Sequence, residues 1–266
     1  MAERPSWAPP EVDLDRPSAA RVYDYFLGGA HNFAVDRQLA DAIAGMTPDI
    51  GDTMRANRQF LRRAVRFLAG AGMTQFLDVG SGIPTVGPVH EVARELRPSA
   101  RVVYVDNDPV AVAHGRALLA GDPLTAVVQA DAREPEAVLA AADLLDLDRP
   151  VAVLLLGVLH FVADADDPPG IVARLRDALP AGSHVALVNV THEDQPPEVI
   201  EAQKMSGRTG TPIFLRSREE LMAQLDGWTV LEPGLVHLPL WRPDPPAEAG
   251  DRPERFGALA AVGRKD

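Results

Sequence analysis

Two glycines follow one of the short apolar runs of the sequence, where a strand is expected to turn into a helix. The run 76–79 leads directly into Gly80, Ser81 and Gly82. Glycine adopts positive φ readily and lets a ligand approach the backbone, and the N-terminus of a following helix attracts negative charge. The loop therefore predicts a ligand-binding turn, with an ordinary strand-to-helix turn as the alternative.

Three carboxylates stand at the ends of three successive predicted strands: Asp78 before the glycine loop, Asp106 after 101–105, and Asp131 after 126–129. Ligands of open α/β sheets bind at the carboxyl ends of the strands. We therefore expect Asp106 to accept ribose hydroxyls and Asp131 to reach an adenine edge. Helix capping is the alternative for each single residue.

The residues around the loop discriminate between two nucleotide cofactors. Thr85 stands where an NAD site has its third glycine, Pro84 lies within the loop, and Asp78 would repel a pyrophosphate. The same carboxylate would attract the cationic amino-acid end of S-adenosylmethionine. The charge favours S-adenosylmethionine over NAD.

Alternating strands and helices must position these residues. Apolar runs at 75–79, 101–105, 126–129, 151–156 and 184–190 are separated by amphipathic segments at 86–97, 110–120, 135–145 and 168–179. This alternation predicts a parallel sheet covered on both faces. Asp108 before Pro109, and Asp167 before Pro168, predict two helix starts.

The C-terminal part has a different pattern. Ser217 and Glu220 have the spacing of a capping box, and the runs 228–231 and 256–262 are joined by a loop without a helix. Two such strands pair antiparallel or lie apart. We predict a Rossmann-like α/β fold of the class I methyltransferase type, with a seven-stranded, mostly parallel sheet, an antiparallel last strand and a helical N-terminal extension.

Residues 1–72 read as a helical cover that belongs to the same domain as the α/β core 73–266. Two helices are expected at 18–27 and 35–43, and a third has an apolar stripe with arginines largely on its other side, at positions 55, 58, 62, 63 and 66. Gly28 and Gly29 suggest a hinge that lays a helix over the cofactor, with Tyr25 or Phe33 as its lid. A helix cap with ordinary packing aromatics is the alternative.

A histidine follows the fourth predicted strand. His160 lies at the functional edge of the sheet, and an imidazole titrates near neutral pH, so it is our candidate general base. A histidine there can equally line the pocket. His192, Glu193 and Asp194 follow the fifth strand on a loop near prolines, and we predict no metal site.

Charge and composition favour certain partners. Asp and Glu outnumber Lys and Arg by 38 to 26, a net charge of −12, which opposes binding to a phosphate backbone. With no cysteine, thiolate catalysis and disulfides are excluded. No signal peptide or membrane span is visible, so we expect a cytoplasmic protein without nucleic-acid or membrane partners. The oligomeric state is not predicted.

The motifs resemble a narrower group. The glycine loop with its acids is similar to class I S-adenosylmethionine-dependent methyltransferases. The runs 16–29 (RPSAARVYDYFLGG), 31–36 (HNFAVD), 55–58 (RANR) and 159–162 (LHFV) resemble an actinobacterial family of S-adenosyl methyltransferases, formerly a domain of unknown function. By this resemblance the loop and Asp78 border the methionine part of the cofactor. Pro84 departs from the broad class, which often has a third glycine there.

The sequence thus predicts a methyltransferase that uses S-adenosylmethionine, with a small-molecule acceptor. A non-catalytic protein that senses S-adenosylmethionine or S-adenosylhomocysteine is the alternative, and an NAD-linked oxidoreductase is less favoured. The residues expected to contact the cofactor are Asp78, Gly80, Ser81, Gly82, Asp106, Asn107, Asp131, Ala132, Gly157, Tyr25, Asn32 and Phe33.

Overall fold

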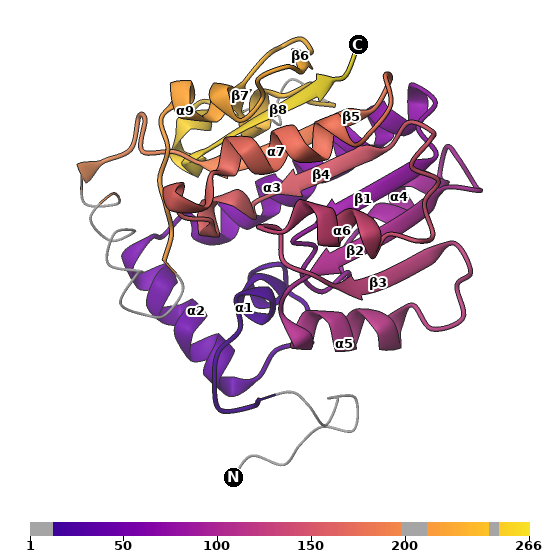
Figure 1. The fold of residues 1–266 in the computed structure, drawn as a ribbon. Helices are drawn as coiled ribbons and strands as arrows, with labels where there is room; N and C mark the ends of the chain where they lie inside the picture. Colours follow the sequence, from indigo (N-terminus) through magenta and orange to yellow (C-terminus); the bar gives the residue numbers. More distant parts are fainter. Residues whose placement is uncertain (1–12, 198–199, 201–211, 245–249) are drawn as a thin grey trace.

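A mixed β-sheet forms the centre of the molecule (Figure 1). The structure is a computed structural model that describes residues 13–197, 200, 212–244 and 250–266. The strands in these residues are β1 (Gln75–Val79), β2 (Arg101–Asp106), β3 (Thr125–Gln129), β4 (Ala152–Leu156), β5 (His184–Val190), β6 (Thr229–Val230), β7 (Val236–His237) and β8 (Ala258–Arg264).

The strand order is β3-β2-β1-β4-β5-β8-β6, and β7 also pairs with β8. Strands β1 to β5 pair parallel, whereas β8 pairs antiparallel with β5, β6 and β7. The predicted antiparallel last strand is thus confirmed. The prediction of seven strands is corrected to eight in the described residues, because the short β7 also pairs with β8.

Helices cover both faces of the sheet. In Figure 1, α6 and α7 lie in front of it, and α3 and α4 lie behind it. The helices are α1 (Ala19–Phe26), α2 (Ala34–Met46), α3 (Ile50–Gly70), α4 (Val89–Arg94), α5 (Pro109–Leu118), α6 (Pro135–Ala140), α7 (Pro168–Asp177) and α9 (Arg218–Ala223). The short 3-10 helices are η1 (Leu159–Phe161), η2 (Asp164–Asp166), η4 (Leu238–Leu240) and η6 (Pro253–Phe256).

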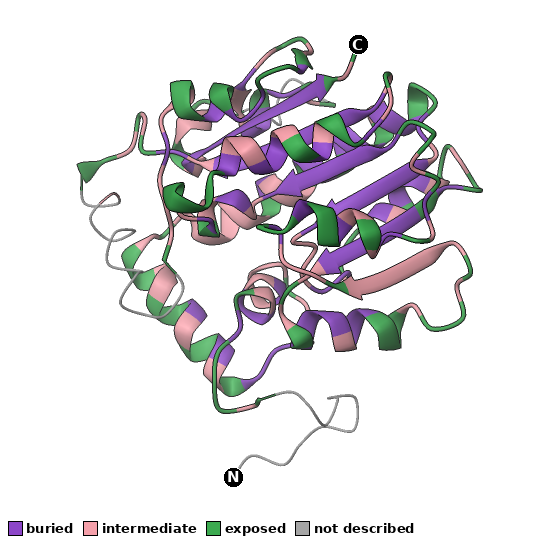
Figure 2. Cartoon of the chain, viewed as in Figure 1, coloured by how far each residue is buried: buried purple, intermediate pink, exposed green. Residues whose placement is uncertain are grey.

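Alternation along each strand divides the buried side chains into two cores. Phe76 and Leu154 point toward α3 and pack with Phe60 and Leu68 of that helix. Leu77 points to the opposite face of the sheet and packs in the second core, with residues of α6 and α7. The central strands are buried on both faces, and the edge strand β3 is only partly buried (Figure 2). This explains why the central strands read as nearly continuous apolar runs.

The predicted helix starts are confirmed. Asp108 Oδ1 accepts a hydrogen bond from the Val110 N–H at 2.8 Å, and the Asp167 carboxylate accepts one from the Gly170 N–H at 3.1 Å. Ser217 and Glu220 form the expected capping box.

Two predicted helices are shorter than expected. The one expected at 86–97 begins only at Val89, after Gly87 with φ +55° and Pro88. The one expected at 135–145 ends at Ala140. Beyond it, Gln75 Oε1 accepts a hydrogen bond from the Asp146 N–H at 2.7 Å, and Gln75 Nε2 donates one to the Asp146 carbonyl at 2.9 Å.

The N-terminal helices divide into two groups. Helix α3 packs in the main core, with Phe60, Ala64 and Leu68 fully buried, so it is a layer of the α/β unit. The cover within the described residues therefore consists of α1 and α2, and residues 1–12 of the predicted extension lie outside the described part. No helix in the described residues is long and apolar enough to cross a membrane.

Candidate functional site

The glycine loop after β1 is held by the neighbouring strand. The N–H groups of Gly80 and Ser81 both donate to the carbonyl of Val105, at 2.8 and 3.0 Å. Gly80 has φ +73°, and a Cβ there would lie 2.5 Å from the side chain of Val158. Glycine is therefore required at position 80 both by its φ and by the approach of the loop that follows β4.

Gly82 has φ +60°, and its nearest neighbour would be the Ala20 Cβ, 3.9 Å from an added Cβ. Helix α1 therefore lies against this loop. The Ser81 hydroxyl donates to the Gly82 carbonyl at 3.2 Å.

Asp106 organises the backbone at the end of β2. Its Oδ2 accepts a hydrogen bond from the Gly82 N–H at 2.8 Å, and its Oδ1 accepts one from the Asp108 N–H at 2.9 Å. Burial raises the pKa of Asp106, while these backbone N–H groups lower it. The structure thus gives Asp106 a loop-shaping role that the sequence did not indicate. Its contact with ribose stays a prediction.

Asp78 is buried on the face of the sheet that α3 covers. Its register neighbours are Tyr104 on β2 and Leu154 on β4, both fully buried. Such surroundings offer a carboxylate little solvation. Burial accordingly raises the pKa of Asp78 to about 7.

Two nearby charges act on Asp78 in opposite directions. The guanidinium of Arg58 on α3 lowers the pKa of this carboxyl, and the carboxylate of Asp106 raises it. The edge therefore places Asp78, Asp106 and a cation of α3 within electrostatic reach of one another.

Asp131 is less buried and already has a cationic partner. The Arg133 guanidinium donates to Asp131 at 2.6 and 3.0 Å, and the Asn107 amide lies 3.4 Å from Oδ2. The hydrogen bond from Arg133 is the main reason that the pKa of Asp131 falls to about 2. The adjacent Ala132 is buried and Asn107 is exposed.

Gly157 opens the loop after β4 with φ +86°. A Cβ at this position would lie 3.5 Å from Cε1 of His160 and 3.7 Å from Nδ2 of Asn57. Gly157 therefore lies beside two polar side chains that come from different parts of the chain.

His160 does not have the titration that was expected of a general base. Burial, and secondarily the charge of Arg216, lowers its pKa to about 3. Its Nδ1 is buried without a hydrogen-bond partner in the described residues. The imidazole is therefore neutral at neutral pH and is available as a hydrogen-bonding group.

Three polar residues near the edge were missed by the sequence reasoning. The Asn57 amide donates to the Tyr23 hydroxyl at 3.0 Å, and the Arg58 guanidinium lies 5.5 Å from the centre of the Tyr23 ring. Tyr23 lies two positions before Tyr25, one of the two residues that were expected to cover the site. The sequence did offer one signal for Tyr23: two residues two positions apart lie on opposite faces of a helix, so Tyr23 and Tyr25 cannot both face the same side.

The predicted lid residues Tyr25 and Phe33, and the predicted cofactor contact Asn32, have other contacts in the structure. Tyr25 directs its hydroxyl to Asp41 of α2 at 3.3 Å, and Phe33 lies under the Arg21 guanidinium at 4.9 Å and packs against Val110. The Asn32 amide group donates to Asp24 and Gly29. All three residues thus contribute to packing within the cover, and their contact with the cofactor stays a prediction.

Asp24 joins the cover to the site and was also missed. Its carboxylate accepts hydrogen bonds from the Thr85 hydroxyl at 2.7 Å and from the His31 N–H at 2.8 Å. A Cβ on Gly29 would overlap this carboxylate, and Gly28 has φ +78° beyond the end of α1. The pair Gly28 and Gly29 thus ends a helix and admits Asp24, which favours the cap interpretation over the hinge.

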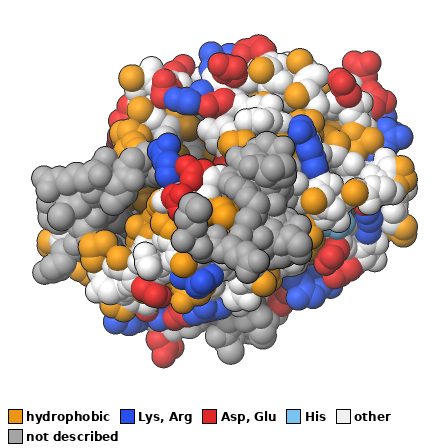
Figure 3. All heavy atoms as spheres, turned by 90° about the horizontal axis from the view of Figure 1, so that it is seen from below, with side chains coloured by type: hydrophobic (Ala, Val, Ile, Leu, Met, Phe, Trp, Pro, Cys, Tyr) orange, Lys and Arg blue, Asp and Glu red, His pale blue; other side chains and the backbone are white. Residues whose placement is uncertain are grey.

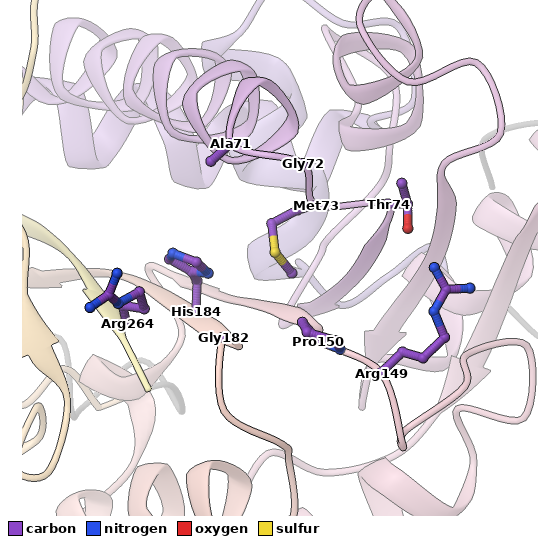
Figure 4. Close-up of a pocket in the computed structure, with 9 residues that line it drawn as sticks. All are labelled: Ala71, Gly72, Met73, Thr74, Arg149, Pro150, Gly182, His184 and Arg264. Carbon is purple, nitrogen blue, oxygen red and sulfur yellow. The ribbon is translucent and has the colours of Figure 1, made fainter. Parts of the chain in front are cut away.

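A separate hollow lies at the opposite edge of the sheet (Figure 4). It measures about 400 Å³ and is lined by residues that include Thr74, Arg149, His184 and Arg264. These residues precede or begin β1, β4 and β5, or end the antiparallel β8. The hollow is therefore at the amino ends of the parallel strands, away from the glycine loop.

The loop after β5 uses its polar groups structurally. Glu193 Oε1 accepts a hydrogen bond from the Arg218 N–H at 2.6 Å, and Asp194 Oδ2 lies 3.4 Å from His237 Nε2. Within the described ranges, no group of three or more His, Cys, Asp or Glu side chains is arranged to hold a metal ion.

The fold and the carboxyl-edge loop define a Rossmann-like protein of the class I methyltransferase type. The S-adenosyl methyltransferase family model matches residues 5–266, and the chain belongs to this family. No match was found among curated proteins.

Solved structures support the same assignment. A candidate methyltransferase of Thermobifida fusca YX has 41% identity and a TM-score of 0.91, covering 98% of this chain and 100% of that chain. A DUF574 family protein of Streptomyces avermitilis MA-4680 has 41% identity and a TM-score of 0.90, covering 96% and 99%. The N-methyltransferase NodS of Bradyrhizobium japonicum WM9 shares the fold, with 12% identity, a TM-score of 0.52 and coverage of 92% and 98%.

Proposed function

We propose that this protein binds S-adenosylmethionine at the carboxyl edge of β1, β2 and β4 and transfers its methyl group to a small-molecule acceptor. One observation carries the proposal: three buried polar atoms with no partner in the described residues belong to side chains that lie near Gly157 of the β4 loop or against Tyr23 of α1. They are Asn57 Oδ1, Arg58 Nε and His160 Nδ1. A buried polar atom without a hydrogen bond is costly, so such a cluster fits a polar ligand.

The donor and acceptor chemistry of the edge fits the cofactor. The buried carboxyl of Asp78 suits a cationic amino-acid end, and an added Cβ at Gly82 would meet only the Ala20 Cβ, at 3.9 Å. Asp106 ends β2 and Asp131 comes shortly after β3, where ribose and adenine would be held. The solved structure of NodS is a complex with S-adenosylhomocysteine, which supports this cofactor class for the shared fold.

A second hollow at the same edge supports a small acceptor. It measures about 410 Å³ and is lined by Asp164, His192, Ile200, Ile213, Phe214 and Leu215. The Phe214 N–H donates to the His160 carbonyl at 2.8 Å, so this hollow adjoins the His160 loop. Its size and mainly apolar lining are those of a small-molecule site.

The surface charge also supports a small acceptor over a nucleic acid. The net charge is −12. On the side where α2 and α5 lie in Figure 1, acidic, basic and hydrophobic side chains are interspersed over the described surface (Figure 3). A phosphate backbone is bound by concentrated Lys and Arg.

The chain needs no strong base for this reaction. When bound, S-adenosylmethionine supplies an activated methyl group on a sulfonium sulfur. The residues of the site then contribute mainly by orienting the acceptor and excluding water. Neutral His160, with its low pKa, would act as a hydrogen-bonding wall of the acceptor side.

Two measurements test the proposal. Thermal unfolding with S-adenosylmethionine, S-adenosylhomocysteine and NAD should show stabilisation by the first two alone, because a ligand that binds only the folded state raises its stability. Stabilisation by NAD alone would overturn the cofactor assignment. Incubation with methyl-labelled cofactor and a small-molecule extract should label an acceptor; binding without labelling would favour the sensor alternative.

A further inference from the structure

Two neighbouring residues of α3 lie on the flank of the helix that approaches the strand edge. Ala56 and Phe60 pack in the core, while Asn57 and Arg58 are half-buried between core and solvent. Asn57 comes close to Gly157 of the β4 loop. The helix that forms one layer of the core thus also presents polar groups to the site.

Tyr23 fixes the orientation of the Asn57 amide. The Asn57 Nδ2 donates to the Tyr23 hydroxyl at 3.0 Å, and that hydroxyl lies 3.3 Å from the Met54 carbonyl, to which it donates. The Asn57 Oδ1 is therefore left as a buried acceptor without a partner in the described residues. An acceptor held in this way suits an incoming N–H donor.

Arg58 contrasts with a second inward arginine of the same helix. Arg63 donates from Nε to the Trp241 carbonyl at 2.9 Å and from a terminal nitrogen to the Leu238 carbonyl at 2.8 Å. Arg58 has a buried Nε without a hydrogen bond in the described part of the chain, and its guanidinium lies over the Tyr23 ring. The hydrogen bonds of Arg63 therefore stabilise the fold, whereas the Nε of Arg58 can still donate a hydrogen bond to a ligand.

Arg58 and Asp78 carry opposite charges but are not a contact pair. The charge of Arg58 lowers the pKa of Asp78, yet the two form no ion pair within 4 Å among the described residues. A cation and a buried carboxyl that do not contact each other, with the acceptor amide of Asn57 next to the cation in the chain, match the two charges of a zwitterion. An α-amino acid group presents a carboxylate and an ammonium group two bonds apart.

We infer that Arg58 binds the α-carboxylate of the methionine part of the cofactor, and that Asn57 Oδ1 with Asp78 receives its ammonium group. This inference rests on the proposed function and adds binding residues from the N-terminal helical segment to those of the glycine loop. Tyr23 is a positioning residue, because it acts through the Asn57 amide and the Arg58 guanidinium.

The test separates the amino-acid end from the nucleoside. Calorimetry is performed with S-adenosylhomocysteine and with methylthioadenosine, which has the same nucleoside and thioether but no amino or carboxylate group. Arg58→Ala should weaken S-adenosylhomocysteine binding by about 10- to 100-fold, the range of a charged hydrogen bond, and change methylthioadenosine binding less than about twofold.

Arg62→Ala is the matched control, because Arg62 lies one turn further along α3 and is exposed. It should leave both affinities unchanged. Arg58→Gln retains much of the stem that packs near Tyr23 and should reproduce the selective loss if Arg58→Ala folds poorly. Unfolding curves of each variant confirm that the folded protein is measured.

The outcomes distinguish the two levels of the proposal. A wild-type protein that binds neither ligand contradicts the proposed function. A wild-type protein that binds S-adenosylhomocysteine, with variants at Arg58 that lose both ligands equally or neither, overturns the assignment of Arg58 alone.

Discussion

Two clusters of buried polar side chains differ in whether their members satisfy one another's hydrogen bonds. In the cover cluster, Arg21 donates to Asp36 at 2.7 Å, and the other oxygen of Asp36 accepts the Ser18 N–H at 3.0 Å. Both charged side chains are almost wholly buried. In the site cluster, Asn57, Arg58 and His160 each retain a buried atom without a partner in the described residues.

This difference distinguishes buried polar groups that stabilise the fold from buried polar groups that are available to bind a ligand. Buried polar groups in folded proteins are almost always hydrogen-bonded, so a cluster that satisfies itself needs no ligand to explain it. The cover cluster fixes α1 and α2 against the sheet edge; Ser18 also reaches the Asp108 carboxylate at 2.5 Å. The site cluster is incomplete in the same protein, and we attribute its missing partner to the bound cofactor.

The largest effect is expected from breaking the cover cluster. Asp36→Asn leaves the Arg21 guanidinium buried without its counter-charge and should lower the free energy of unfolding by about 3–5 kcal/mol. Urea denaturation measures this loss. Glu95→Gln is the control, because its 3.9 Å ion pair with Arg66 is exposed and should contribute less than about 1 kcal/mol. Equal effects of the two substitutions would remove the distinction between the clusters.

A substitution at Asp78, whose carboxyl is under the influence of Arg58 of the site cluster, is expected to change stability in the opposite direction. The pKa of Asp78 is about 7 in the folded protein, above its ordinary value of 3.8, so the folded state binds the proton more tightly and wild-type stability falls between about pH 4 and pH 7. Asp78→Asn removes this penalty. At pH 8 the variant should be more stable by up to about 4 kcal/mol, with the gain vanishing near pH 4.

Chemical denaturation of the Asp78→Asn variant at both pH values provides the measurement, and calorimetry should show that it has lost affinity for S-adenosylhomocysteine. A variant that is destabilised at pH 8 would place Asp78 with the structural polar groups.

Ligand affinity should depend on pH through the same carboxyl. The groups that act on Asp78 are Arg58 from α3, which favours its charged form, and Asp106 from β2, which opposes it. Because the ammonium group needs the carboxylate, affinity for S-adenosylhomocysteine should fall about tenfold from pH 8 to pH 6. Methylthioadenosine, which has no ammonium group, should show no such fall; a parallel fall would point to another titrating group.

The smallest effect is expected at the adenine side. Arg133 already donates hydrogen bonds to Asp131, so Asp131→Asn removes only part of the capacity of this side chain to accept hydrogen bonds from the adenine base. We expect affinity for S-adenosylhomocysteine to fall about threefold. A loss beyond tenfold would mean that Arg133 releases the carboxylate when the nucleoside binds.

The strand framework and its turns could be predicted because they depend on local patterns. Buried parallel strands give continuous apolar runs, and the starts at Asp108 and Asp167 follow from an acidic cap before proline. The short strand β7 could not be predicted, since two residues carry no periodicity and pair only through the distant β8.

Sequence reasoning named the residues of the candidate site that lie at strand ends, and it did not name those that come from the helical segment. Asp78 and the glycines follow directly from strand ends. Asn57 and Arg58 belong to a polar helix flank that, by composition, looks like solvated surface. Arg63 was placed on the same polar side and is in fact buried, because carbonyls of η4 and Trp241 accept its donors. Such tertiary partners are invisible in a helical pattern.

The antiparallel strand β8 also constrains how the chain acquires its shape during synthesis. Strands β6 and β7 precede β8 in the chain, and in the described residues they pair with β8 alone. A nascent polypeptide therefore carries two strands with open edges until β8 has been translated and inserted beside β5. Open edges invite wrong pairing between molecules, so this half of the sheet is where chaperone dependence and aggregation should begin.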